Sequence, residues 1–218
     1  MSSELYDAEA PQRVRVALLQ EGEQIEVTHV LRAPSDEQVL VYVNAGYTGN
    51  EDEAFAVGVQ LWNELIDGAE GYEDAEGNAP TKLALIDGVD AQDKFFAVEN
   101  GLLATRTLPV PKAQPGRKFV LGNSGNSAGA IFKLGVFNNG QEIVTTHILR
   151  RPTTDEYRQG QAWLASQANG TARAETMAAL YDKLKVSVAG YANRVPVHHK
   201  VIVVLAHLRR QQQLVMGK

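Results

Sequence analysis

The chain has 218 residues, of which 44% are hydrophobic and 22% are charged, so it can form one large or two smaller soluble domains with real cores. Its net charge of −5 argues against a general nucleic-acid-binding surface, which requires clustered positive charge. The absence of cysteine excludes disulfides and thiolate metal sites.

Residues 1–7 carry acid where a secretory signal carries base, and no apolar stretch follows them. The longest apolar run, residues 201–206, is too short to cross a bilayer. We therefore expect no membrane partner, and a protein kept in the cytosol or in a particle assembled there.

The main feature of the sequence is an internal repeat. Residues 28–35, Thr-His-Val-Leu-Arg-Ala-Pro-Ser, recur 118 positions later as Thr-His-Ile-Leu-Arg-Arg-Pro-Thr. Residues 61–65, Leu-Trp-Asn-Glu-Leu, recur 119 positions later as Leu-Tyr-Asp-Lys-Leu, and a Gly-Tyr pair follows each block at 71–72 and 190–191. Ordered matches at nearly one offset predict a tandem duplication.

The boundary between the two copies is predicted from proline. Residues 108–116 contain three prolines, which is typical of a semi-extended linker. We predict a first copy over residues 1–110 and a second copy over residues 117–218.

Each copy is predicted to begin with a β-hairpin. Apolar and polar residues alternate over 13–19 and 24–32 in the first copy, and over 131–137 and 141–150 in the second. The second hairpin has an Asn-Gly pair at its turn, residues 139–140, and both residue types tolerate positive φ.

A proline ends each hairpin and turns the chain towards a helix. Pro34 and Pro152 lack an N–H and disfavour helix at the residue before them. Ser35, and Thr153 or Thr154, then provide a helix N-cap that acidic residues follow. The predicted fold class is therefore α+β, with two tandem domains that are each a β-hairpin followed by helices.

Helical spacing of apolar residues predicts helices over residues 51–67, 155–167 and 172–188, with Thr171 available to cap the last of these. Residues 197–213 fit either a final helix or a buried strand. The sequence leaves that choice open.

One catalytic motif needs to be weighed. Residues 125–129 match the Gly-x-Ser-x-Gly pattern of a hydrolase, with Ser127 as nucleophile and His198 or His207 as the base. However, the motif requires a helix after the serine, and the repeat assigns residues 131–137 to a strand. A Gly/Asn/Ser loop is the better interpretation, with a hydrolase or small-ligand-binding protein as the alternative.

His29 and His147 are the only histidines present in both copies, and we expect each to be a packed, neutral imidazole. Trp62 and Tyr181 occupy equivalent helix positions and are predicted to belong to the core. Residues 67–78 are acid-rich but lack the ligand spacing of a calcium loop. We therefore predict no catalytic site, metal or other cofactor.

The hairpin that runs through Leu-Arg-Arg-Pro-Thr into an acid-capped helix resembles segments of small bacteriophage virion and tail-assembly proteins. This resemblance implies a non-enzymatic structural protein: a capsid-, neck- or tail-associated component that bridges neighbouring subunits in the virion, assembled in the bacterial cytoplasm. A tail-assembly chaperone is the alternative within the same class.

The partners are expected to be other protein subunits, without direct nucleic-acid binding. Arginine is favoured at protein interfaces because its planar fork pairs with carboxylates. We call residues 32–37 and 150–156, where a strand leads into a helix, the first and second corners. These corners and the basic last third of the chain contain the predicted partner-binding residues: Arg32, Arg150, Arg151, Arg209 and Arg210. Acidic stretches such as 51–53 or 67–76 of another copy could receive them. The alternative is that Arg150 pairs within its own domain and Arg151 is solvated.

Overall fold

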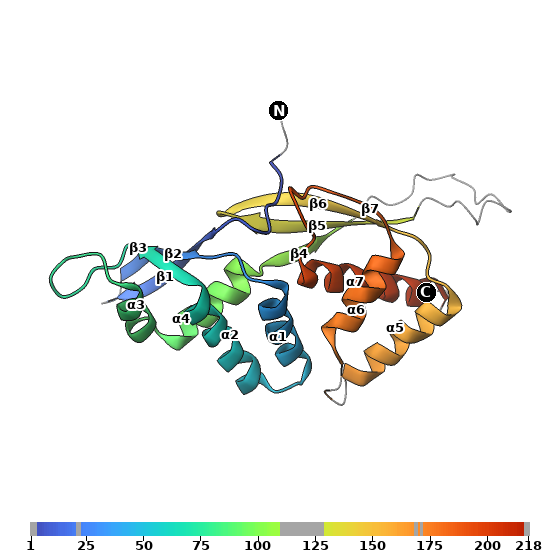
Figure 1. The fold of residues 1–218 in the computed structure, drawn as a ribbon, viewed down its shortest axis with the longest axis horizontal. Helices are drawn as coiled ribbons and strands as arrows, with labels where there is room; N and C mark the ends of the chain where they lie inside the picture. The colour runs from blue at the N-terminus through green and yellow to red at the C-terminus, as the bar shows by residue number, and fades with distance from the viewer. Residues whose placement is uncertain (1–3, 21–22, 110–128, 168–169, 171, 216–218) are drawn as a thin grey trace.

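The computed structural model is an α+β protein with two antiparallel sheets and seven α-helices among the residues it describes (Figure 1). These residues are 4–20, 23–109, 129–167, 170 and 172–215. The predicted α+β class is confirmed. We call residues 1–110 the first half and residues 111–218 the second half.

The first half begins with a hairpin, a pair of helices and a returning strand. These are β1 (Gln12–Gln20), β2 (Glu23–Leu31), α1 (Asp36–Tyr47), α2 (Glu51–Leu65) and β3 (Ile66–Glu70). The strands form a sheet in the order β1-β2-β3.

The second half contains the same order of elements. These are β5 (Ala130–Asn138), β6 (Gln141–Leu149), α5 (Thr154–Gln167), α6 (Ala174–Leu184) and β7 (Lys185–Ala189). Asn139 and Gly140 have φ values of 50° and 78°, as the Asn-Gly turn predicts.

The two sheets also share their register. Gln12 lies opposite Leu31 in the first hairpin, and Ala130 lies opposite Leu149 in the second, 118 positions later in each case. The returning strand pairs with the middle strand in both sheets, and a β-bulge interrupts the pairing just before Leu31 and just before Leu149.

Five further elements complete the fold: α3 (Lys82–Gly88), α4 (Ala91–Ala97), a π-helical turn η1 (Val98–Leu102), β4 (Thr105–Leu108) and α7 (Val197–Val215). Strand β4 belongs to the first half but pairs with β5, so it extends the second sheet. The undecided segment 197–213 is helical, as α7. The predicted linker lies outside the described residues from position 110 onward.

Two predicted helices were too long. Helix α2 ends at Leu65 and α6 ends at Leu184, and the residues that follow are strands β3 and β7. The carbonyl of Leu65 accepts the Arg32 N–H at 2.9 Å, and that of Leu184 accepts the Arg150 N–H at 2.9 Å. Pairing with the middle strand therefore overrides the helical periodicity of the local sequence. Thr171, the predicted cap of α6, lies outside the described residues.

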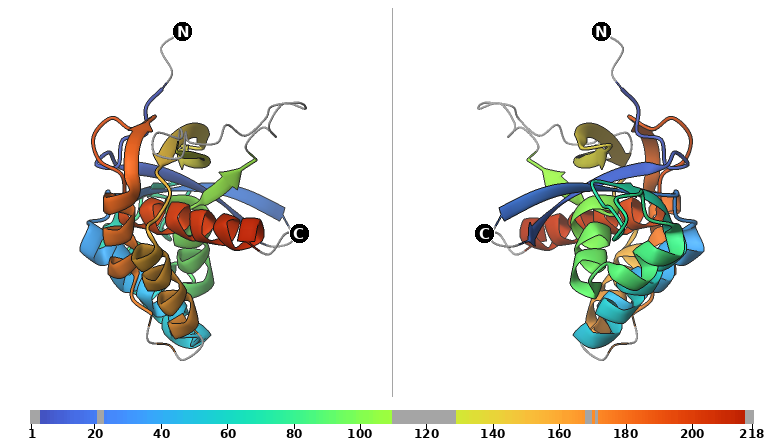
Figure 2. Two further views of the ribbon diagram at one scale, coloured as in Figure 1. Left: turned by 90° about the vertical axis from the view of Figure 1, so that its right-hand side faces the viewer. Right: turned by 90° about the vertical axis from the view of Figure 1, so that its left-hand side faces the viewer.

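The core lies between the sheets and the helices, which pack on one face of the sheets (Figures 1 and 2). The predicted core aromatics Trp62 and Tyr181 are both 0% exposed. Leu65 and Leu184 end the two helices beneath the sheets and are 1% and 0% exposed. No helix in the described part of the chain is long and apolar enough to span a membrane.

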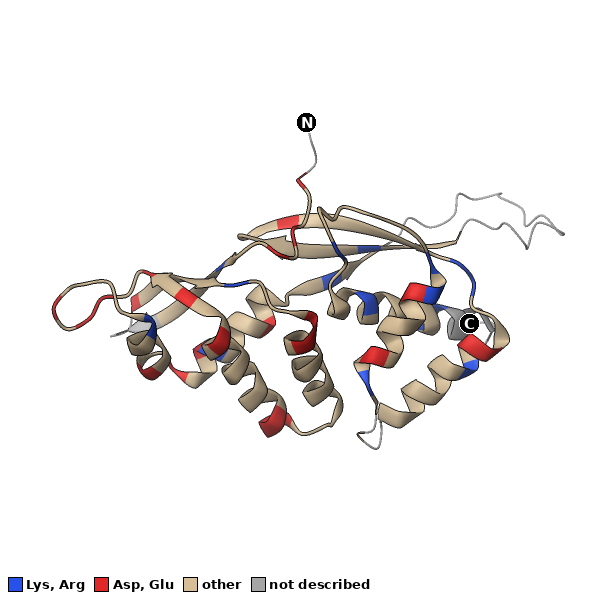
Figure 3. Ribbon diagram, in the orientation of Figure 1, with Lys and Arg blue, Asp and Glu red and all other residues tan. Residues whose placement is uncertain are grey.

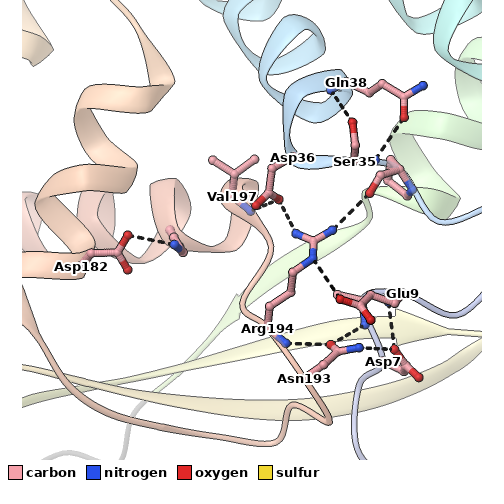
Figure 4. A network of polar contacts seen from close by, with 12 residues as sticks. Asp7, Glu9, Ser35, Asp36, Gln38, Asp182, Asn193, Arg194 and Val197 are labelled. Atoms are coloured by element: carbon pink, nitrogen blue, oxygen red, sulfur yellow. Dashed lines mark hydrogen bonds and ion pairs between the residues drawn. The ribbon is translucent and has the colours of Figure 1, made fainter.

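Helix α1 joins the two halves. Tyr47 packs edge-on against Trp163 of α5 at 5.0 Å between ring centroids. At the other end of α1, Asp36 accepts hydrogen bonds from the Arg194 guanidinium and, at 3.3 Å, from the Val197 N–H at the start of α7 (Figure 4). One carboxylate thus begins α1 and caps α7.

Replacing Leu184 with alanine should lower the free energy of unfolding by about 2–5 kcal/mol, because the side chain is fully buried and would leave a cavity. Urea denaturation measures this change. Val186→Ala is the control, since Val186 is 61% exposed and should change stability by less than about 0.5 kcal/mol. An unchanged Leu184→Ala variant would show that α6 does not pack as described.

Candidate functional site

The second corner is held together by Arg150. Its Nη1 and Nη2 atoms donate to the Glu156 carboxylate at 2.8 and 2.7 Å, and the Thr153 N–H donates to the same carboxylate at 2.8 Å. The Arg150 guanidinium, helped by Thr153, lowers the pKa of Glu156 to about 2. Arg150 is therefore engaged within its own half, which agrees with the alternative stated above.

The first corner uses its arginine differently. Arg32 Nη2 donates to the Glu64 carbonyl at 2.6 Å, and its Nε lies 3.4 Å from Asp67. Ser35 caps α1, as predicted from the sequence, and it forms a capping box with Gln38. Arg32 thus secures the α2–β3 junction of the first half.

The other predicted partner-binding residues are free of ion pairs within the described part of the chain. Arg151, Arg209 and Arg210 are exposed. His207 Nε2 donates a hydrogen bond to the Arg150 carbonyl at 3.1 Å, which ties α7 to the second corner. Arg151 lies at that corner and Arg209 and Arg210 lie on α7, whereas Arg32 belongs to the other corner.

A buried histidine lies at the centre of the first half. His29 of β2 is 0% exposed, its Nδ1 accepts the Trp62 indole N–H at 3.1 Å, and its Nε2 contacts the Tyr72 hydroxyl at 2.8 Å. Because Nδ1 is an acceptor, the proton resides on Nε2 and the imidazole is neutral. This ring links the middle strand, α2 and the chain after β3.

The equivalent histidine in the second half has the same kind of environment. His147 is 0% exposed, with Nδ1 2.8 Å from the Tyr181 hydroxyl and Nε2 3.1 Å from the Tyr191 hydroxyl. The Tyr191 hydroxyl also lies 2.9 Å from Nδ1 of His199 on α7. We call His29 with Trp62 and Tyr72, and His147 with Tyr181 and Tyr191, the two histidine clamps.

Sequence reasoning identified the histidine and the helix aromatic of each clamp but assigned no role to the third member. The signal was present, because Tyr72 and Tyr191 are the repeated Gly-Tyr residues. No known protein family, curated protein or solved structure matches this chain.

The two histidines of the hydrolase alternative are buried. His207 is 0% exposed and donates a hydrogen bond to the Arg150 carbonyl, and His198 is 6% exposed. His198 also lines a pocket, with Tyr42 and Val201 among its other lining residues. Ser127, the nucleophile of that alternative, lies outside the described residues.

The two halves differ most in charge. Residues 1–110 contain 21 acidic and six basic residues, a net charge of −15, whereas residues 111–218 contain five acidic and 15 basic residues, a net charge of +10. Figure 3 shows the acidic residues spread over the helices and loop of the first half and most basic residues on the second. The chain is strongly bipolar although its net charge is modest.

The outer faces of the sheets differ as well. On the first sheet, Arg13 pairs with Glu70 and Arg15 with Glu26. The corresponding face of the second sheet carries the Arg106–Glu142 ion pair beside exposed apolar side chains: Ile131 at 40%, Phe137 at 36% and Val144 at 49%. Two similar frames therefore present two chemically different surfaces.

The buried histidines predict a loss of stability in mild acid. Burial lowers the pKa of His29, His147 and His198 to about 4, against about 6.5 in the unfolded chain. Between these two pKa values the unfolded state binds more protons than the folded state. The free energy of unfolding is therefore highest above pH 6.5 and decreases as the pH falls towards 4. The decrease should reach at most about 1.4 kcal/mol per pH unit for each histidine.

Urea denaturation at pH 7.5, 6 and 5 tests this expectation. Glu156 titrates below this range and does not contribute to the slope. His147→Gln keeps a hydrogen-bonding side chain but removes one titrating group, so its pH profile should be shallower. A wild-type profile that is flat over this range would contradict the assignment of neutral clamps.

Proposed function

We propose that this chain is a non-enzymatic protein that arose by tandem duplication and bridges neighbouring protein subunits of a phage-like particle. The proposed copies correspond to residues 1–110 and 117–218. The observation that carries this proposal is that the two halves share a frame but have opposite net charge and different outer faces.

Four correspondences support the duplication. The halves share the order of elements, the hairpin register, the position of the β-bulge and the histidine clamp. The clamp is the most specific of these, because His29 and His147 each contact one aromatic side chain from the second of the two helices that follow and one from the chain after the returning strand. Unrelated hairpins have no reason to share this arrangement.

Bridging follows from the difference between the halves. An acidic half and a basic half in one chain can bind two unlike neighbours at the same time, and charge complementarity selects correct partners and speeds their encounter. Exposed Arg151, Arg209 and Arg210 are the proposed contacts of the second half, and acidic protein surfaces are their proposed partners. This role requires no membrane, nucleic acid or cofactor.

The phage context is supported by the sequence resemblance around residues 146–153. It implies a virion location and assembly in the bacterial cytoplasm. A tail-assembly chaperone remains the alternative, and the exposed apolar face of the second sheet would suit transient binding of a tail component. The hydrolase alternative has weaker support, because His198 and His207 are buried.

Composition of purified particles separates the first two functions. Mass spectrometry of gradient-purified particles, from cells that carry the natural gene, should detect the chain in a fixed ratio to other subunits. A chaperone would instead be found in the cell lysate and be missing from finished particles. Ester hydrolysis by the purified protein that disappears in Ser127→Ala would overturn the non-enzymatic proposal.

Charge reversal at the second corner should impair incorporation into the particle. Arg151→Glu combined with Arg209→Glu places like charges against an acidic neighbour, so we expect a several-fold lower copy number in particles. Lys133→Glu combined with Arg158→Glu makes the same change of charge elsewhere on the second half and serves as the control. Equal incorporation of both variants would place the contact outside this corner.

A further inference from the structure

An acidic groove lies between α1 and α2. It has a volume of about 220 Å³, and Val41, Val57 and Leu61 line it together with the carboxylates of Glu37 and Glu64. Val41 is 55% exposed. The groove therefore combines an apolar surface with negative charge.

The Glu64 carboxylate is held by hydrogen bonds from two amides and forms no ion pair with a described side chain. The Gln38 side-chain amide donates to it at 2.7 Å, and the Gln60 amide donates at 3.0 Å. Both donors are uncharged, and neither Glu64 nor Glu37 forms an ion pair with another described side chain. A cation that enters the groove would meet a carboxylate that is held by two amides and has no described cationic partner.

A surface of the opposite character is found at the end of α6 and along β7. All five residues of β7 are exposed, including Val186 at 61% and Val188 at 37%. Lys183 and Lys185 precede these valines in the sequence. Both lysines are exposed and form no ion pair within the described residues. We call residues 183–189 the basic ridge.

In the corresponding part of the first half, the charged side chains form ion pairs. Strand β3 carries Asp67 and Glu70, which pair with Arg32 and Arg13 of the same half. Charged side chains on an edge strand protect it from unwanted pairing. The basic ridge lacks such internal partners, and its Lys183 occupies the position equivalent to Glu64.

We infer that this protein associates with itself head to tail, with the basic ridge of one molecule seated in the acidic groove of the next. Lys183 and Lys185 would pair with Glu37 and Glu64, while the ridge valines would cover the apolar surface of the groove. The inference rests on the proposed function, because it names a second copy of this chain as one of the bridged neighbours.

The geometry of this contact determines what kind of assembly it forms. Groove and ridge are different surfaces on different halves, so the contact is heterologous and each molecule can use both surfaces at once. Heterologous contacts generate a ring if the rotation closes and a filament if it does not. Because the charged groups are exposed, the association should weaken as salt rises.

Analytical ultracentrifugation of the purified full-length protein tests the contact. The wild type should form concentration-dependent oligomers at low salt and dissociate at high salt. Lys183→Glu with Lys185→Glu should weaken association by roughly tenfold or more, and Glu37→Lys with Glu64→Lys should do the same, because each places like charges together.

Mixing the two variants provides the decisive measurement. The acidic ridge of one variant complements the basic groove of the other, and the remaining native surfaces also match, so the mixture should recover oligomers. Lys133→Glu with Arg158→Glu is the control for changed net charge and should associate as the wild type does. Thermal unfolding of each variant verifies that it is folded.

Several outcomes would overturn the inference. They are a wild type that stays monomeric at low salt, unaltered association of the ridge variant, or a mixture that does not recover. A monomeric wild type that is nevertheless found in purified particles would leave the proposed bridging function intact and reject only self-association. Absence from particles with recovery in the mixture would do the reverse.

Discussion

A neutral imidazole on the middle strand of each sheet determines how the surrounding elements fit together. His29 and His147 are fully buried and bond at both ring nitrogens, so protonation would remove an acceptor inside a dry core. Each ring joins its strand to α2 or α6 and to the chain beyond the returning strand. The change from helix to strand at Leu65 and Leu184 occurs next to these contacts.

Direct contacts join the two halves. Asp36 begins α1 and also receives the first N–H of α7, while Asn44 of α1 accepts the Ala174 N–H at 2.7 Å at the start of α6. Strand β4 of the first half extends the second sheet. Breaking the halves apart would expose these donors and an apolar helix face, so the proposed copies are parts of one body.

A common frame with different surfaces suits a protein that binds unlike neighbours. The clamps and hairpins are common to the two interiors, while the second sheet exposes apolar side chains at positions where the first carries charged ones, as at Ile131 and Arg13. The same contrast separates β3, whose acids are paired, from the basic ridge, whose lysines are not. In such an arrangement, buried residues determine stability and surface residues determine which partner is bound. A surface substitution can then alter binding without altering stability.

The sequence by itself determined the local features. Alternation and the Asn-Gly pair gave the hairpins, the prolines with Ser35 and Thr153 gave the corners, and the repeat identified both clamp histidines. Tertiary structure decided what depends on distant partners: the strands after Leu65 and Leu184, and the helical state of α7. Backbone pairing and burial outweigh the small energies of local propensity, and a sequence window does not contain the strand or helix that supplies them.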